Sequence, residues 1–341
     1  MRLLFIVLMA ISHHAFSLVV LQYHHVDAST PSITSVTPEQ FAQHMALLEE
    51  EKMVVVDLED VTHALLNGET IPDRAVAITF DDAYQSIYEH AFPVLRKKHW
   101  PFTVFVSTAA VDREFPDMMT WEQLRDLYSE GAVIANHTQD HPYLINTPKD
   151  TEKEIFWQEQ IIDAEKRLLE EIGESPKIFA YPYGEYTIPM AEWLENQGFI
   201  AFGQQSGAIG QNSHPQVLPR FPASGAYANL DTLRTKLNSR SFGIGRDEVV
   251  DPVIKKRIPK LTLRIPIEDF DPDTLQCYAA GLGEMDISPK SRRGKVTVVL
   301  KQEKQIESGR GRYNCTAPSL RDPKRFYWYS QLWINTDVEN R

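Results

Sequence analysis

The chain has 341 residues, of which 43% are hydrophobic and 24% are charged, a composition typical of folded soluble proteins rather than disordered ones. Its length allows two or three domains. The formal net charge of −12 argues against a nucleic-acid-binding protein, because such a protein needs a basic face to contact phosphates.

Residues 1–17 are predicted to form a secretory signal peptide. Arg2 provides a short positive region, residues 3–11 are apolar, and residues 15–17 form a small-residue cleavage site. A buried N-terminal strand is the alternative interpretation. No later apolar run reaches the roughly 20 residues of a transmembrane helix. We therefore expect an exported protein, periplasmic or secreted, without an integral membrane segment in the mature chain.

Residues 18–242 alternate short apolar segments with amphipathic ones. Helices are expected after Thr37, after the aspartates at 81 and 82, from Thr120 to Gly131, and up to Gly173. Repeated strand–helix units predict a parallel sheet covered by helices, and seven strands fit an α/β barrel better than a small open sheet. The strand candidates are "LVVLQYH", "AVAITFDD", "FTVFVS", "GAVIANH", "KIFAYPYG", "FIAFGQQ" and "QVLPRFP".

Beyond residue 242 the pattern changes to a linker, residues 243–260, and a small all-β sandwich, residues 261–341. The segments "KLTLRIPI", "KVTVVLKQ" and "RFYWYSQLWIN" are strand-like and are separated by turn-rich loops such as "SPKSRRGK" and "ESGRGRYN". The aromatic side chains of the last strand segment are expected to be core in their alternating half, with sugar stacking as the alternative.

The chain has two cysteines, Cys277 and Cys315. In an oxidising compartment an even pair usually forms a bridge, so we expect a disulfide that holds the β-sandwich. Two buried thiols are the alternative.

Two adjacent carboxylates, Asp81 and Asp82, end the strand segment "AVAITF". Neighbouring carboxylates repel each other, and a metal cation would remove that repulsion. One could then bind the metal while the other takes a proton from water. The alternative is a helix N-cap at Asp82.

A second cluster, His137 and His141 in "GAVIANHTQDHPYL", also follows an apolar run. Spacing by four residues on one helical turn would place both imidazoles on one face. Together with an aspartate they provide three ligands suited to zinc, or less selectively to cobalt, nickel or manganese, with positions left open for water and substrate. Taken alone, the two histidines would as often be solvent-exposed. A third segment, "FAYPYGEY", forms a tight loop that can offer a backbone N–H to an oxyanion, or is a plain turn.

The segments "TFDD", "HTQDH" and "YPYG", in this order and spacing, resemble the first three motifs of the polysaccharide deacetylase family, the NodB-homology fold of carbohydrate esterase family 4. The opening "LQYHHV" is similar to the Tyr-His-x-Val start of many members, and the resemblance covers residues 19–242. The form "FAYPYG" resembles the branch that acts on poly-β-1,6-N-acetylglucosamine, a biofilm exopolysaccharide.

The resemblance implies a distorted (β/α)₇ barrel that removes N-acetyl groups from sugar polymers. It implies that a divalent metal, with zinc favoured and cobalt or nickel possible, is bound by Asp82, His137 and His141. Asp81 is then the general base, and the N–H of Tyr183 helps to hold the oxyanion.

Two family features are missing. Ala180 stands where an arginine that orients the base is expected, and the late Leu-x-His motif that provides the general acid is not evident. Arg220 is a candidate for the missing charge, and His24 or His214 for the proton donor. Their structural alternatives are a salt-bridge partner, a core histidine and a loop residue. His24, Pro182 and Arg220 are also candidates for substrate contact.

The sequence therefore predicts an exported, metal-dependent N-deacetylase acting on an N-acetylglucosamine polymer, with the poly-β-1,6-linked form favoured. Chitin oligosaccharides or peptidoglycan are alternative substrates. A catalytically silent carbohydrate-binding protein on the same fold and a structural matrix protein that adheres through its β-domain are the rivals. Nucleic acid is not an expected partner.

Overall fold

The computed structural model describes residues 16–254, 258–302, 304–307 and 309–338. The predicted signal peptide, residues 1–17, lies almost entirely outside these ranges. Within them, no helix has the length and apolar character needed to cross a membrane.

The first part of the chain is built on a curled parallel sheet with the strand order β10-β1-β5-β6-β7-β8-β9. Each of these strands falls within a segment predicted from the sequence. The chain before β10 joins the two ends of the sheet, because Leu218 pairs with Phe202 of β9 and Phe221 pairs with Leu21 of β1. The predicted distorted barrel is thus confirmed. Its strands are β1 (Val19–Tyr23), β5 (Ala75–Asp81), β6 (Thr103–Val106), β7 (Val133–Asn136), β8 (Ile178–Ala180), β9 (Ile200–Phe202) and β10 (Phe221–Pro222), and β4 (Val54–Val55) pairs with β5.

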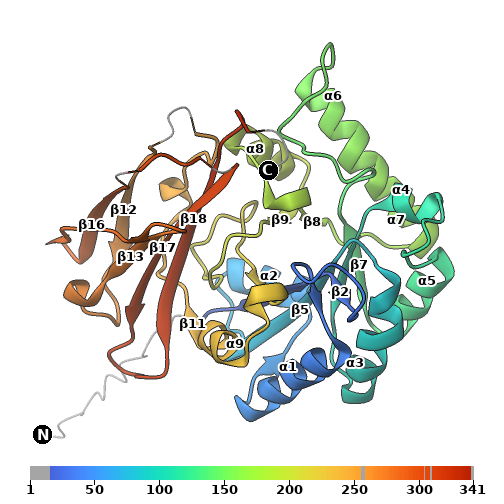
Figure 1. The fold of residues 1–341 in the computed structure, drawn as a ribbon, viewed down its shortest axis with the longest axis horizontal. Helices are drawn as coiled ribbons and strands as arrows, with labels where there is room; N and C mark the ends of the chain where they lie inside the picture. The colour runs from blue at the N-terminus through green and yellow to red at the C-terminus, as the bar shows by residue number, and fades with distance from the viewer. Residues whose placement is uncertain (1–15, 255–257, 303, 308, 339–341) are drawn as a thin grey trace, which may run out of the picture.

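Helices cover the outside of this sheet (Figure 1). Thr37 and Thr120 begin their helices with capping boxes, and Gly173 ends the longest helical segment in the left-handed conformation, all as predicted. The helices are α1 (Pro38–Glu50), α2 (Leu58–Leu66), α3 (Phe92–Lys98), α4 (Thr108–Asp112), α5 (Trp121–Ser129), α6 (Lys153–Trp157), α7 (Asp163–Ile172), α8 (Ile188–Asn196) and α9 (Leu230–Leu237), with π-helical turns η1 (Ile87–Ala91) and η2 (Gln158–Ile162).

The strand alternation decides which side chains fill the barrel. Along β5, Val76, Ile78 and Phe80 pack outward against the helices. Ala75 and Ala77 belong to a separate inner core. Since successive side chains on a strand point to opposite faces, Thr79 and then Asp81 follow on the inward face. The last inward position of β5 is therefore a carboxylate.

The C-terminal part is a sandwich of two mainly antiparallel sheets that share one apolar core, as predicted, with one parallel pair at the edge of the five-stranded sheet. Figure 1 shows these strands, in orange to red, beside the α/β body. One sheet has the order β11 (Ser239–Arg240), β18 (Phe326–Ile334), β17 (Arg310–Pro318), β13 (Gln276–Ala279) and β14 (Gly283–Glu284). The other has the order β12 (Lys260–Pro266), β16 (Lys295–Lys301) and β15 (Lys290–Arg292).

The prediction of turn-rich loops at two segments of this part is wrong. "ESGRGRYN" contributes the start of β17, and "SPKSRRGK" contributes β15. Glycine and charged residues disfavour strands locally, but β17 pairs with β18 along its whole length from Arg310 to Pro318. Pairing with neighbouring strands overrides the local preference.

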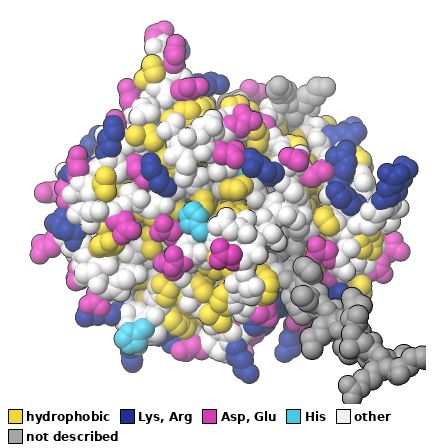
Figure 2. Space-filling model, turned by 180° about the vertical axis from the view of Figure 1, so that it is seen from behind, with side chains coloured by type: hydrophobic (Ala, Val, Ile, Leu, Met, Phe, Trp, Pro, Cys, Tyr) yellow, Lys and Arg dark blue, Asp and Glu magenta, His cyan; other side chains and the backbone are white. Residues whose placement is uncertain are grey.

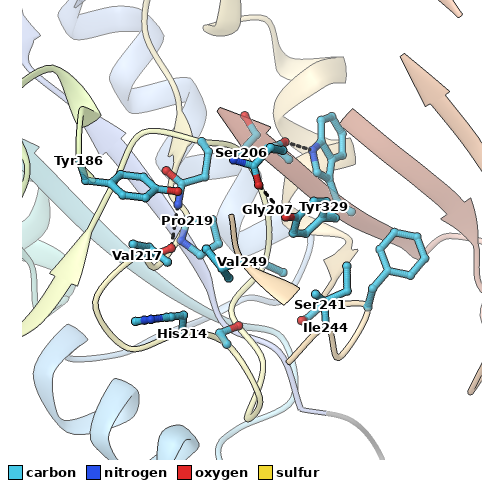
Figure 3. A pocket seen from close by; sticks show the side chains of 17 residues that line it. Tyr186, Ser206, Gly207, His214, Val217, Pro219, Ser241, Ile244, Val249 and Tyr329 are labelled. Atoms are coloured by element: carbon cyan, nitrogen blue, oxygen red, sulfur yellow. Dashed lines mark hydrogen bonds between the residues drawn. The ribbon is translucent and has the colours of Figure 1, made fainter. Parts of the chain in front are cut away.

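The two parts of the chain pack against each other. The Phe221 ring lies 5.5 Å from the ring of Trp328, edge to face. A cavity of about 60 Å³ remains at the junction, lined by Tyr186 and His214 of the barrel part and by Trp328 and Tyr329 of the sandwich (Figure 3). On the face of the molecule opposite the view of Figure 1, acidic and basic side chains are interspersed (Figure 2).

The five-stranded sheet includes β11, which precedes residue 242, so the predicted domain boundary at that residue stays a prediction.

The alternating aromatic residues of β18 are core, as expected. Tyr327 and Trp333 are buried in the sandwich, and Tyr329 packs against the same core. None of these three side chains lines the large cleft described below.

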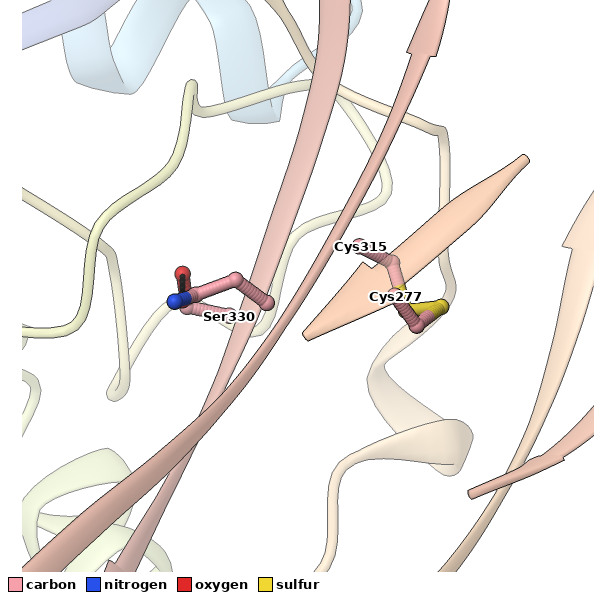
Figure 4. The surroundings of a disulfide bond; sticks show 4 residues. Cys277, Cys315 and Ser330 are labelled. Atoms are coloured by element: carbon pink, nitrogen blue, oxygen red, sulfur yellow. Dashed lines mark hydrogen bonds between the residues drawn. A yellow bond between two sulfur atoms is a disulfide. The ribbon is translucent and has the colours of Figure 1, made fainter. Parts of the chain in front are cut away.

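Cys277 and Cys315 form the predicted disulfide (Figure 4). The two residues face each other on the neighbouring strands β13 and β17, so the bridge lies within one sheet. It joins positions separated by 38 residues.

Replacing both cysteines by alanine is expected to lower the free energy of unfolding by about 3–4 kcal/mol, because the unfolded chain regains the freedom of that loop. Thermal unfolding of the double variant and the parent protein checks this. The control is the parent protein in a reductant that does not bind metals, which should melt like the double variant. Equal stability of the variant and the oxidised parent would contradict the expectation.

Candidate active site

Asp81 lies at the C-terminal end of the barrel interior and is fully buried. Arg220 donates to both of its carboxylate oxygens, with N–O distances of 2.6 and 2.9 Å. The amide of Gln22, on β1, donates to the Asp81 Oδ2 at 2.6 Å. This arrangement fixes the carboxylate from two sides.

The electrostatics of Asp81 follow from these neighbours. Burial by itself would raise the pKa of this carboxyl, but the positive charge of Arg220 holds the pKa well below its usual range. Asp81 is therefore ionised throughout the neutral range, with its charge balanced by a bidentate ion pair. The position at which the resemblance predicts an arginine is occupied by the uncharged Ala180. Arg220, from another part of the barrel, provides a guanidinium instead.

The expectation that Arg220 contacts substrate is not supported by its position. Its side chain is fully buried, and its Nε donates to the Gly203 carbonyl at 3.0 Å. With its hydrogen bonds directed into the barrel, the guanidinium reaches Asp81 and not the open cleft. The predicted salt-bridge alternative describes it correctly.

Asp82, His137 and His141 form a group that could hold a metal ion. Their ligand atoms all lie within 4.8 Å of one another. The Nε2 atoms of both histidines lie 3.4 Å from the Asp82 Oδ1. Burial lowers the pKa of His137 to about 3 and also lowers the pKa of His141, so both rings are neutral and able to act as ligands.

The position of each ring has a local cause. The His137 Nδ1 donates to the backbone carbonyl of Ala180 at 2.7 Å, which directs its Nε2 toward Asp82. The predicted helical turn between the two histidines is wrong. Thr138 and His141 have φ values of 73° and 54°, and the Thr138 hydroxyl accepts from the His141 N–H at 2.9 Å. A side-chain-stabilised bend, not a helix, brings the rings together.

Left-handed backbone is concentrated at this site. Asp82 and Ala83 after β5, Thr138 and His141 after β7, and Tyr183 after β8 all have φ between 54° and 74°. Non-glycine residues adopt this conformation at a cost of about 1–3 kcal/mol each, and it persists only where surrounding contacts hold it. Three strand ends thus carry strained turns around one point.

The third predicted segment ends β8 and forms the short helix η3 (Pro182–Gly184). Pro182 is buried and fixes the turn, whereas Tyr183 lines the cleft, so the expected substrate contact of Pro182 is not supported. The Tyr183 ring lies 4.5 Å from the His141 ring and stacks on Tyr143 at 4.0 Å. The loop is therefore packed directly against His141 of the candidate metal-binding group.

Asp82, His141 and Tyr183 line a cleft of about 620 Å³. His24 lines the cleft, and its Nε2 lies 3.9 Å from the Asp81 Oδ2. His214 instead lies in the junction cavity of Figure 3, which shares no lining residue with the cleft, so its position does not support a role as proton donor. Sequence reasoning missed several lining residues. Gln22 lies on the predicted strand β1 but carries no motif, and the others come from loops or from β17, whose start was not predicted as a strand: Ile33, Tyr84, Phe115, Tyr227, Arg310 and Arg312.

Comparison with known proteins places this geometry in context. A family model described as polysaccharide deacetylase matches residues 68–201. The chain is 26% identical over 316 residues to the poly-β-1,6-N-acetyl-D-glucosamine N-deacetylase of Escherichia coli (strain K12), which covers 78% of this chain and 46% of that protein. It is 28% identical over 198 residues to the enzyme of the same name from Staphylococcus aureus (strain MSSA476), which covers 55% of this chain and 67% of that protein. The chain thus spans about half the length of the E. coli relative.

The structure of IcaB from Ammonifex degensii superimposes with a TM-score of 0.55 and is 30% identical, covering 63% of this chain and 97% of the IcaB chain. Nearly the whole of that solved chain therefore has a counterpart here. From its sequence motifs, its curled barrel and this likeness, the chain belongs to the polysaccharide deacetylase family.

Proposed function

We propose that this protein hydrolyses the N-acetyl groups of an N-acetylglucosamine polysaccharide and releases acetate. One observation carries the proposal: a buried, ionised carboxylate, Asp81, lies beside a group of one aspartate and two neutral histidines that borders an open cleft. In the reaction water adds to the acetamide carbonyl, the C–N bond breaks, and the nitrogen takes a proton to leave as the amine.

The two adjacent aspartates have different parts in this proposal. Asp81, held by Arg220 and Gln22, takes the proton from the attacking water. Asp82 faces the two histidines and would bind the cation together with them. The backbone N–H of Tyr183 holds the developing oxyanion, which the left-handed turn at that residue supports. His24 lies on the cleft side of Asp81 and donates a proton to the leaving nitrogen.

The residues fit a divalent metal. Two neutral imidazoles and one carboxylate form a three-ligand set with open positions, the usual arrangement of a catalytic site, and the His137–Ala180 hydrogen bond is a typical outer contact of a metal-binding histidine. When bound, the metal supplies a Lewis acid for the acetamide carbonyl. Zinc is favoured by this ligand set, with cobalt or nickel as alternatives.

The favoured substrate is poly-β-1,6-N-acetylglucosamine. The names of the E. coli and S. aureus relatives support this choice. We also propose that the chain is exported to the periplasm or the exterior, where such a polymer is found, with residues 1–17 as the signal peptide.

The test is acetate release by the purified mature chain from β-1,6-linked and β-1,4-linked N-acetylglucosamine oligomers, with zinc supplied and then chelated. We expect metal-dependent release that is faster with the β-1,6 oligomers. Preference for β-1,4 oligomers would move the assignment to chitin or peptidoglycan. No release from either with zinc bound would leave a silent carbohydrate-binding protein.

Zinc is expected to raise the melting temperature more at pH 7.5 than at pH 5. Burial, with a smaller contribution from the charge of Asp81, raises the pKa of Asp82 to about 6, although His24 opposes the shift. Because the folded-state pKa is raised, the metal-free fold loses stability as the pH rises through about 6, and a bound cation removes that loss. At a free zinc concentration one hundred times the dissociation constant, the gain is about 2.7 kcal/mol.

Scanning calorimetry with and without zinc at the two pH values measures this difference. His141→Ala should abolish the zinc effect, whereas His63→Ala, on the exposed face of α2, should keep it. An equal zinc effect at both pH values would show that protons do not compete with zinc for Asp82.

A further inference from the structure

The cleft is not made by the barrel alone. Arg310 and Arg312, on strand β17 of the C-terminal sandwich, line it together with Tyr183 and His141. The two arginines are two positions apart on a strand, so their side chains leave the same face of the sheet. One face of β17 therefore forms a wall of the candidate active site.

Arg310 contacts the loop that follows β8. Its Nε donates to the Glu185 Oε1 at 2.9 Å, and its guanidinium carbon lies 5.6 Å from the centre of the Tyr183 ring. Glu185 is fully buried, two residues after Tyr183. A buried carboxylate needs a partner of opposite charge, and this one receives it from a strand 125 residues further along the chain.

The loop needs such support. Tyr183 has φ 60° and ψ 4°, a conformation that a non-glycine residue keeps only under tight constraint. Its ring packs on Tyr143 and His141, and the adjacent Gly184 lies against Gln204, so close that an added Cβ would be 2.6 Å from the Gln204 Cβ. The Arg310–Glu185 ion pair is the contact in this set that comes from the C-terminal domain.

We propose that Arg310 is a positioning residue of the active site, through which the C-terminal β-domain holds the Tyr183 loop in place. The inference rests on the proposed function for the role of that loop. Arg310 does not take part in proton transfer. It neutralises Glu185, and the anchored loop keeps the Tyr183 backbone and ring in register with His141.

The experiment compares Arg310→Gln, the double variant Arg310→Gln/Glu185→Gln, and Arg325→Gln in the full chain. Arg325 is the matched control, because it also links the sandwich to the barrel, through a 2.8 Å ion pair with Asp73 outside the cleft. Kinetics of acetate release give kcat and KM separately, a chelator competition gives the zinc dissociation constant, and melting temperatures report stability.

Arg310→Gln is expected to lower kcat by about 10–100-fold, the range found for supporting residues around a site, with KM within about threefold. The double variant should regain at least about fivefold in kcat, because the buried carboxylate that has lost its ion pair with Arg310 is then absent from the loop. Arg325→Gln should lower the melting temperature and keep kcat within about twofold. A general loss of stability predicts neither the rescue nor the difference between the two arginines.

Wild-type kcat in Arg310→Gln, or an equal loss of kcat in Arg325→Gln, would overturn the proposal. If the wild-type chain releases no acetate, the proposed function fails, and the zinc measurement then decides this inference. Because the Tyr183 ring packs on His141, Arg310→Gln should weaken zinc binding by at least about threefold, whereas Arg325→Gln should leave it unchanged. Unchanged zinc binding in both variants would refute the positioning role.

Discussion

Replacing Asp81 by asparagine is expected to lower kcat for acetate release by about 10²–10⁴-fold, the usual contribution of a general base. The amide has the size of the carboxylate, and its single oxygen can still accept from Gln22 and one Arg220 nitrogen, but its NH₂ group accepts no hydrogen bond and the amide cannot take a proton from water. Zinc binding should remain, because Asp81 is not one of the three grouped ligands. Acetate release by the zinc-loaded variant measures the effect.

This substitution also removes the charge that balances the buried Arg220, so a loss of stability must be separated from a loss of chemistry. Asp269→Asn is the matched control, because Asp269 is a buried carboxylate that contacts Arg240 and Arg321 in the C-terminal sandwich. It should lose stability and keep its activity per folded molecule. More than a tenth of wild-type kcat in folded Asp81→Asn would show that another group is the base.

Replacing Arg220 by glutamine is expected to lower the free energy of unfolding by about 3–5 kcal/mol at pH 7, because it leaves Asp81 buried without a counter-ion. In the parent protein the Asp81 pKa is depressed, so the pair contributes stability above about pH 4 that is lost as the pH falls. In the variant, burial raises that pKa. The stability difference between the two proteins should therefore narrow in acid.

Activity should respond in the same direction. With a raised pKa, Asp81 is protonated over more of the pH range, so the acid limb of the kcat/KM profile moves to higher pH. Arg220→Lys should restore part of the shift, since it returns the charge without the bidentate geometry. Arg246→Gln, which breaks the surface ion pair with Glu195, is the control and should cost less than about 1 kcal/mol. An unmoved acid limb in Arg220→Gln would contradict the assignment of Asp81.

Much of the fold follows from local patterns in the sequence. The seven barrel strands are short apolar segments with helical segments between them, and both features are visible in any one stretch of chain. The ends of β5 and β7 also show their polar residues directly, so the amino-acid sequence alone is enough to place Asp81, Asp82, His137 and His141 at one edge of the sheet.

The pairing of Asp81 with Arg220 cannot be derived in this way. The two residues are 139 positions apart, and only the closure of the sheet between β9 and β1 brings them together. The bend between the histidines is hard to predict for a different reason, because a spacing of four residues also fits a helical turn. The sequence does contain a signal, since Asn136 and Thr138 both accept from backbone N–H groups, and such residues favour turns over helices.

Strand β17 shows the limit of local reasoning most clearly. Its first residues are arginine and glycine, which are typical of loops. The segment forms a strand because it pairs with β13 and β18. The side chain of Arg310 cannot be assigned to the cleft unless the pairing of its strand is known.

The last strand of the chain, β18, bears on whether the barrel and the sandwich are independent of each other. Leu332 and Ile334, near the end of β18, are buried among Phe179, Leu194 and other apolar side chains of the barrel part. A fragment that stops near residue 242 would leave that apolar surface open to water. The barrel and the sandwich are therefore not independent modules. A recombinant of two relatives joined near residue 242 would need matching apolar side chains on both sides of this shared core.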